Sequence, residues 1–117
     1  MKATYLFASI PVADRDAAVA WYEAAFGREP DLIPNDDEAC WQLTDTGWIY
    51  LIGDPERAGT GLNTILVADL TALVAHFERL GTGPSPIDTS IPGMLTSVLT
   101  DPDGNRIQFA QQVEQEG

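Results

Sequence analysis

One segment of this sequence occurs twice, and the repeat limits the possible folds more than any other feature. Val12–Glu23 and Val67–Glu78 are identical at seven of twelve positions, and the two copies lie 55 residues apart. The match continues downstream, where Leu43–Asp45 corresponds to Leu99–Asp101. A chain of 117 residues has room for two such copies only. Two similar half-structures must cover each other's apolar faces, so we expect a seam between them that can hold a ligand.

The pattern within each copy predicts one strand, one helix and then three strands. Residues 5–12 alternate large and small apolar groups, as a strand does. Asp14 and Gly27 then enclose an amphipathic helix, and Asp69 and Gly81 do the same in the second copy. Short β-type segments follow each helix, and they cover residues 30–33, 39–44 and 48–52, and then 85–89, 94–100 and 106–111. The sequence therefore predicts an α+β fold of tandem βαβββ modules.

Residues 1–117 are expected to form a single domain. Module 1 covers about 1–53 and module 2 about 61–112, and a linker of turn-forming and charged residues joins them. A module of about 55 residues is near the lower limit for folding alone, so the two should share a core or a dimer interface. Asp101–Asn105 predicts a tight turn between two strands. Residues 113–117 form a polar tail that is expected to fray.

The charge of the chain is strongly negative, and this excludes some classes of partner. Eighteen acidic and six basic side chains give a formal net charge of −12. Such a chain repels phosphate backbones, so nucleic-acid binding is not expected, whereas a cationic partner would be attracted. No apolar run approaches about 18 residues and no signal-like N-terminus is present, so no membrane contact is expected. Since the single Cys40 cannot form an internal disulfide, a cytoplasmic protein is predicted.

Two motifs carry a resemblance to a known family. Ile10–Asp14, with the sequence IPVAD, leads into a helix that carries Trp21-Tyr22 and Phe26-Gly27. Near the other end of the chain, residues 101–109 read DPDGNRIQF. Together with the duplicated module, these motifs resemble the vicinal oxygen chelate superfamily, which includes glyoxalases, extradiol dioxygenases and bleomycin-binding resistance proteins. The resemblance covers essentially the whole chain, and it implies a curved mixed sheet around a cavity, helices on the outer face and a homodimer.

The resemblance also identifies the positions at which the metal enzymes of this family hold their ion. These positions lie on the first and last strand of each module, and in this sequence they are Phe7, Tyr50, Leu62 and Gln108. A divalent ion of this kind needs about three or more imidazole, thiolate or carboxylate donors from the protein. The four positions offer one phenol, one amide and two hydrocarbons. We therefore predict no metal, no cofactor and no catalytic residue, and an enzyme is less expected than a binding protein.

The aromatic and apolar groups at these positions instead predict a ligand-binding cleft. Flat rings favour stacking with planar or cationic groups, at about 0.5 to 2 kcal/mol per contact. The amide of Gln108 can orient a ligand, because it both donates and accepts hydrogen bonds. Trp41 and Met94 are candidates for further wall, although the sequence does not fix the direction of their side chains. The predicted ligand-binding residues are Phe7, Trp41, Trp48, Tyr50, Leu62, Met94 and Gln108.

The other chemically reactive side chains fit structural roles. Cys40 has no histidine in its own strand or in the matching strand of the other copy, so we interpret it as a small core residue. His76 lies on the second helix at the repeat position of Trp21, where a helix-flank residue is expected. No glycine-rich phosphate loop follows a predicted strand.

Three functions fit these observations. The first is a metal-free binding protein of the bleomycin-resistance type, which sequesters a planar or cationic small molecule in the aromatic cleft. The second is a glyoxalase-like lyase or isomerase, or a dioxygenase-related enzyme, with an atypical site. The third is a non-catalytic interaction domain. The aromatic set and the negative charge favour the first.

Overall fold

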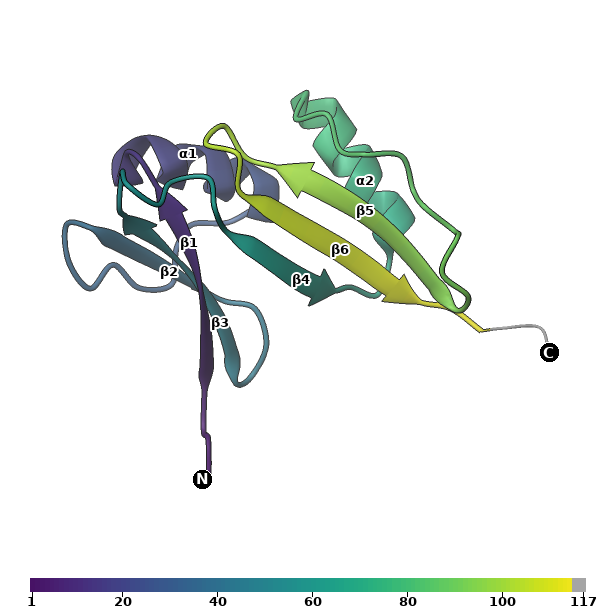
Figure 1. The fold of residues 1–117 in the computed structure, drawn as a ribbon, viewed down its shortest axis with the longest axis horizontal. Helices are drawn as coiled ribbons and strands as arrows, with labels where there is room; N and C mark the ends of the chain where they lie inside the picture. The colour runs from purple at the N-terminus through teal and green to yellow at the C-terminus, as the bar shows by residue number, and fades with distance from the viewer. Residues whose placement is uncertain (115–117) are drawn as a thin grey trace.

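The computed structural model describes residues 1–114, which form two similar units placed side by side (Figure 1). The first unit consists of β1 (Leu6–Val12), α1 (Arg15–Phe26), β2 (Glu38–Gln42) and β3 (Gly47–Gly53). The second consists of β4 (Leu62–Leu66), α2 (Leu70–Leu80), β5 (Met94–Thr100) and β6 (Arg106–Gln112). Both helices lie on the same side of the strands (Figure 1). Residues 115–117 of the predicted polar tail lie outside the described residues.

Both helices begin and end where the sequence predicts. The Asp14 side chain accepts hydrogen bonds from two backbone N–H groups of the first turn of α1, and Asp69 accepts one in α2. These bonds satisfy donors that a helix N-terminus otherwise leaves free. Gly27 and Gly81 end the helices with φ angles of 75° and 74°. Neither helix is long and apolar enough to cross a membrane.

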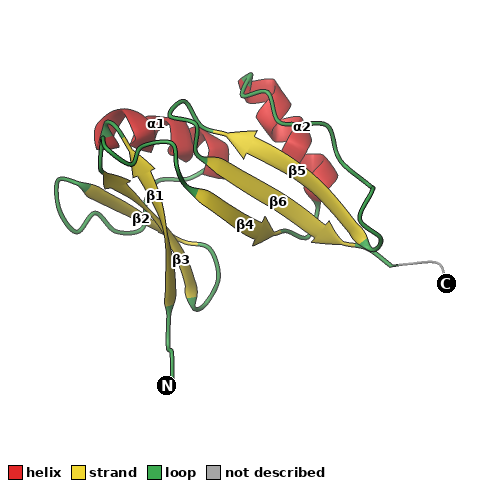
Figure 2. Cartoon of the chain, viewed as in Figure 1, coloured by secondary structure: helices red, strands yellow, loops and turns green. Residues whose placement is uncertain are grey.

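Each unit contains a three-stranded mixed sheet (Figure 2). In the first sheet β3 lies in the centre, parallel to β1 and antiparallel to β2. In the second sheet β6 lies in the centre, parallel to β4 and antiparallel to β5. The two units therefore have the same topology, and the predicted α+β fold with mixed sheets is confirmed. The strands form two separate sheets rather than one continuous sheet.

One of the four strands predicted for each module, the strand directly after the helix, is reduced to a single bridge. Residues 30–33 and 85–89 each make one isolated bridge, at Leu32 and Asp88 respectively. Prolines flank or interrupt both segments, and proline has no N–H to donate to a ladder. The prediction of full strands in these two segments was wrong. Each unit is βαββ with one additional bridge.

The core lies between the sheets and the helices. In β3, Ile49 and Leu51 are buried toward the helices, while Trp48 and Tyr50 alternate with them on the opposite face. We call the face away from the helices the open face. Residues from both units enter one buried cluster, which contains Ile10, Val12, Tyr22, Ala25, Ala39, Trp41, Ile49, Leu51, Leu70, Val74, Phe77, Leu99, Ile107 and Phe109. The units therefore share a core, as the size of each module led us to expect.

The turn between β5 and β6 joins the two units. Asp101 is 5% exposed, and its carboxylate accepts hydrogen bonds from the Tyr22 phenol at 2.8 Å and from the Asn105 side chain at 2.8 Å. Asn105 Nδ2 also donates to the Pro11 carbonyl, and Asn105 Oδ1 accepts from the Gly61 N–H, both at 2.7 Å. Burial, and then the negative charge of Asp101, raises the pKa of the Tyr22 phenol beyond its ordinary range, so the phenol remains a donor. We call these five residues the joint.

Candidate functional site

Three aromatic side chains gather on the open face of the first sheet. The parallel pairing of β1 with β3 places Phe7 opposite Trp48. The two rings are stacked, with centroids 5.5 Å apart and planes inclined by 19°. The Phe7 ring also meets the Tyr50 ring edge-on at 6.4 Å. Since Trp48 and Tyr50 are two residues apart in one strand, both point to the same face. We call these three residues the aromatic cluster.

The aromatic cluster is partly open to solvent. Phe7 remains 50% exposed, and Trp48 and Tyr50 are partly exposed. The Nε1 atom of Trp48 is buried and has no hydrogen-bond partner among residues 1–114. A buried indole N–H usually has an acceptor. The cluster therefore exposes ring surface, while the indole N–H of Trp48 is enclosed without an acceptor.

The open face of the second sheet carries polar groups. Leu62 lies opposite Arg106, and Thr64 lies opposite Gln108, in the parallel pairing of β4 with β6. Leu62 is 63% exposed, Arg106 is exposed and Gln108 is partly buried. Amide, hydroxyl and guanidinium groups on this face can donate hydrogen bonds to a ligand.

The repeat relates the two open faces position by position. The register of β4 with β6 reproduces that of β1 with β3, at the separation of 55 residues found between the first strands. By this correspondence Gln108 takes the place of Tyr50, and Arg106 takes the place of Trp48. Module 1 therefore presents rings where module 2 presents hydrogen-bonding groups.

Two of the predicted site residues, one from each module, line a single cavity. Tyr50 and Leu62 both border a cavity of about 370 Å³ at the meeting point of the two units, which we call the junction cavity. Ser9 and Asn63 also line it, and Asn63 Nδ2 donates to the Ser9 carbonyl at 3.3 Å. Arg57 from the linker lines the same cavity, and its guanidinium is 3.0 Å from the Asp54 carboxylate.

A second hollow lies between the edges of β1 and β4. It has a volume of about 350 Å³ and an apolar lining that includes Trp48, Leu6 and Leu66. Phe7 and Gln108 line neither this groove nor the junction cavity. Several of the predicted residues thus lie on the open faces, where Tyr50 and Leu62 share one hollow and Trp48 borders the other.

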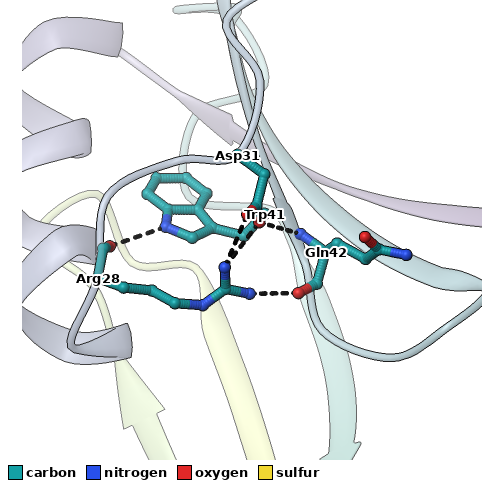
Figure 3. Close-up of polar contacts among 4 residues, drawn as sticks. All are labelled: Arg28, Asp31, Trp41 and Gln42. Atoms are coloured by element: carbon teal, nitrogen blue, oxygen red, sulfur yellow. Dashed lines mark hydrogen bonds and ion pairs between the residues drawn. The ribbon is translucent and has the colours of Figure 1, made fainter.

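Trp41 lies in the core and not on the open face. Its side chain is 0% exposed, and its Nε1 donates to the Arg28 carbonyl at 3.0 Å (Figure 3). Arg28 donates to both Asp31 carboxylate oxygens, at 2.8 and 2.9 Å, and also to the Gln42 carbonyl. The backbone N–H of Gln42, and then Arg28, lowers the pKa of Asp31 below its ordinary value. This network holds the segment after α1 against β2, so Trp41 supports the fold and does not reach a ligand.

Met94 lies on the open face but far from the junction cavity. It pairs with Gln112 at one end of β5, whereas Thr100 at the other end pairs with Arg106, which lies beside Leu62 of the junction cavity. At about 3.3 Å per residue, Met94 lies about 20 Å along the strand from Thr100. The direction of Met94 therefore agrees with a wall position, while its distance does not favour contact with the same ligand.

Cys40 and His76 occupy structural environments. Cys40 is 4% exposed, and burial, followed by the nearby charge of Glu38, raises the pKa of its thiol above the ordinary value. The reactive thiolate is thereby disfavoured. His76 Nε2 donates to the Ala24 carbonyl at 3.0 Å, because a carbonyl oxygen can only accept, and this bond links α2 to α1.

The family's metal positions do not fit a divalent ion in this chain. Phe7 and Leu62 supply hydrocarbon, and Tyr50 and Gln108 supply one phenol and one amide. In the part of the chain that the structure describes, no three His, Cys, Asp or Glu side chains gather into a group able to hold a metal. The donor chemistry of the open faces supports stacking and hydrogen bonding instead.

Sequence reasoning missed several residues around the junction cavity. Ser9, Asn63 and Arg57 line it, and Arg106 flanks Leu62 in the register of the second sheet. The composition of the linker predicts only a connection, and nothing in it marks Arg57 as a lining residue. Arg106 could have been found from the repeat, since it occupies the position that corresponds to Trp48.

The structure is similar to several solved structures. One is a glyoxalase / bleomycin resistance protein from Catenulispora Acidiphila DSM 44928, with a TM-score of 0.86 and 34% identity over 95% of this chain and 100% of that chain. Another is a bleomycin-binding protein complexed with bleomycin, with a TM-score of 0.76 and 18% identity over 97% of this chain and 99% of that chain. TnmS3, an antibiotic binding protein from Streptomyces sp. CB03234, gives a TM-score of 0.76 and 18% identity, with 97% of both chains covered.

The family assignment rests on the sequence as well as on the fold. Comparison with curated proteins gave no match. The model of the Glyoxalase/Bleomycin resistance protein/Dioxygenase superfamily, in contrast, matches residues 4–109, which is most of the chain. Because this model matches most of the chain, and because the fold and the register of the repeat agree with it, the chain belongs to the Glyoxalase/Bleomycin resistance protein/Dioxygenase superfamily.

Proposed function

We propose that this protein binds and sequesters a planar small molecule, without a metal and without catalysis. The observation that carries this proposal is the aromatic cluster, with its exposed Phe7 ring and the unpaired Nε1 of Trp48. Two solved structures of the same fold are described as binding bleomycin or an antibiotic, which makes small-molecule binding a reasonable role for this scaffold. Identity to both is 18%, so they support the fold and not a particular ligand.

The ring set favours a planar ligand more directly than a cationic one. Stacking requires only a flat partner at a ring face, and the exposed face of Phe7 provides it. The case for a cationic ligand rests on the attraction of ring faces for cations, and on the net charge of the chain, which governs solubility and encounter rates more than the contents of one cleft. We therefore propose a planar ligand and keep a cationic ligand as the alternative.

Replacing Trp48 with alanine is expected to weaken ligand binding by about tenfold, because the stacking surface of the indole and its support for the Phe7 ring are lost. Isothermal titration with a panel of planar aromatic compounds and cationic antibiotics, bleomycin included, measures the affinity of the wild type and the variant. Trp21→Ala is the matched control, since Trp21 lies on α1 away from the open face. Equal losses in both variants, or no binding by any compound of the panel, would contradict sequestration.

We further propose that two copies associate through the free edges of β1 and β4. Within residues 1–114 neither edge pairs with another strand beyond its own sheet. Large apolar side chains are exposed there, including Leu6 at 73% and Leu66 at 57%. Open edges with exposed apolar groups favour pairing with another chain. The radius of gyration is 14.8 Å, against about 13 Å expected for a compact domain of this length. A chain this extended leaves the edges of β1 and β4 accessible to a second copy.

A homodimer predicts a solution mass of twice 12.7 kDa. Leu6→Asp is expected to convert it to a monomer, because a charge is costly to bury at an apolar interface. Light scattering during gel filtration gives the mass. Leu80→Asp introduces the same charge at an exposed leucine at the end of α2 and should leave the mass unchanged. A wild-type monomer at high micromolar concentration, or a Leu6→Asp variant that stays dimeric, would count against this assembly.

A further inference from the structure

We propose that the planar ligand carries a cationic group, which binds the Asp54 carboxylate in the junction cavity while the ligand ring lies against Tyr50. This inference rests on the proposed function and specifies the charge of the ligand at the same site. Its basis is the lining of the junction cavity, where a carboxylate and an aromatic ring border one hollow. It does not depend on the net charge of the whole chain.

The junction cavity has the size and the mixed lining of a small-molecule site. Its volume of about 370 Å³ lies within the range of about 300 to 1,000 Å³ that is usual for ligand pockets. Apolar walls come from Ile52 and Leu62, and hydroxyl or amide groups come from Ser9, Thr60 and Asn63. A few polar groups in an apolar wall fix the orientation of a bound ligand.

Asp54 and Arg57 are the two charged residues among the described residues that line this cavity. Asp54 directly follows β3, and its backbone N–H donates to the Val12 carbonyl at 2.9 Å. Its side chain is 28% exposed, whereas the Arg57 side chain is 73% exposed. The carboxylate is therefore held at the cavity wall, while most of the Arg57 side chain lies in solvent.

The ion pair between these two residues is of a weak kind. Arg57 donates to one carboxylate oxygen of Asp54, Oδ2, at 3.0 Å. Arg28, in contrast, donates to both carboxylate oxygens of Asp31. The other oxygen of Asp54, Oδ1, has no hydrogen-bond partner within residues 1–114. Because exposed ion pairs add little stability, a ligand cation can bind the free oxygen or take the place of the guanidinium.

Tyr50 adds a second attraction for a cation. Its side chain is partly exposed and lines the same cavity as Asp54. The face of an aromatic ring attracts cations, and it also stacks with a flat ring. A ligand that joins a planar ring to a cationic group therefore uses both residues, whereas the Asp54 carboxylate repels an anionic ligand.

The charges beside the cavity do not decide the preference. Glu38 lies opposite Ile52 in the pairing of β2 with β3, and Arg106 lies opposite Leu62 in the pairing of β4 with β6. Neither Glu38 nor Arg106 lines the cavity. One carboxylate and one guanidinium act in opposite directions on the charge of a ligand, so the groups that line the cavity determine which ligand is favoured.

Three probes with the same naphthalene ring test this inference. They carry an aminomethyl, a hydroxymethyl or a carboxylate group at the same ring position, so that at neutral pH one is a cation, one is neutral and one is an anion. Isothermal titration of the full chain should give the aminomethyl probe an affinity about tenfold higher than that of the hydroxymethyl probe. The carboxylate probe should bind most weakly.

Two variants assign the preference to the cavity. Asp54→Asn should remove the preference for the aminomethyl probe. Arg57→Gln should raise the affinity of that probe by about threefold or more, because a competing cation is lost. Glu29→Gln and Arg79→Gln change the net charge by the same amounts at residues that do not line the cavity, and both should leave the preference unchanged.

The outcomes separate this inference from the proposed function. Equal affinities for the aminomethyl and hydroxymethyl probes, tightest binding of the carboxylate probe, or an undiminished preference in Asp54→Asn would overturn the inference while leaving planar-ligand binding intact. An Arg57→Gln variant with unchanged affinity for the aminomethyl probe would also contradict it. Binding of none of the probes would overturn both.

Discussion

Asn105→Ala is expected to lower the free energy of unfolding by about 3 to 4 kcal/mol. Asn105 is 1% exposed, and its amide serves three partners in the joint, Pro11, Gly61 and Asp101. Alanine would leave all three without that contact, and two of them, Pro11 and Asp101, are buried. Each buried polar group left unpaired costs about 1 to 3 kcal/mol. The joint is therefore the most sensitive polar feature of the fold.

Urea unfolding followed by far-ultraviolet circular dichroism measures this change. The matched control is Asn63→Ala, which removes an amide at the same seam with a single bond of 3.3 Å to Ser9. That control should cost about 1 kcal/mol or less. If Asn105→Ala and Asn63→Ala were equally mild, the joint would not be what holds the two units together.

Gly59→Ala is expected to destabilise the protein by about 3 kcal/mol or more. Gly59 has a φ of 86°, a region that L-residues enter at a cost of about 1 to 2 kcal/mol. A Cβ at this position would lie 2.1 Å from the Asp103 carbonyl oxygen. That oxygen belongs to the backbone of the turn between β5 and β6 and cannot move aside without shifting the turn. The linker and the turn would have to separate.

Gly83→Ala separates the two contributions. Gly83 has a φ of 64°, and a Cβ there meets no atom within 4 Å. Alanine at 83 should therefore show the backbone cost alone, about 1 to 2 kcal/mol. The additional loss in Gly59→Ala, measured in the same urea titrations, reports the contact between linker and turn. An equal loss in the two variants would show that this close approach has no energetic weight.

Asn105→Ala and Gly59→Ala are expected to change the geometry of the proposed binding site as well as stability. Gly59 and Asn105 hold the linker and the β5–β6 turn, and the junction cavity lies between the units that they connect. A loosened joint lets the two open faces change their relative orientation. Ligand affinity should therefore fall in these variants even at temperatures where both remain folded.

The repeat and the capping residues made most of the fold predictable. The helix ends are specified by local chemistry, with an aspartate cap at each start (Asp14 and Asp69) and a glycine at each end (Gly27 and Gly81). The structure has the helices between these residues. The short strands were predictable from alternation, apart from the two segments where proline removes donors. Helix caps and strand alternation depend only on residues that are close in sequence, so they can be recognised without the structure.

The site was less predictable, because its geometry depends on contacts between distant segments. Alternation within β2 should have assigned Trp41 and Cys40 to opposite faces, but it cannot say which face meets the helices. Only the packing of α1 decides that Trp41 is buried. The division of the predicted set between two hollows, and the place of Arg57, follow from how the units meet. The sequence likewise indicates only a turn residue at position 105. In the structure, the Asn105 side chain contacts Pro11 and Gly61, which are distant in sequence, as well as Asp101.

The alternation along the strands has a practical consequence for engineering. Side chains such as Ile49 and Leu51 hold the protein folded, while their immediate neighbours Trp48 and Tyr50 contribute little to the shared core. A library randomised only at the outward positions of β1, β3, β4 and β6 would explore new specificities on an unaltered hydrophobic scaffold. The open faces can thus be redesigned independently of the residues that hold the chain folded.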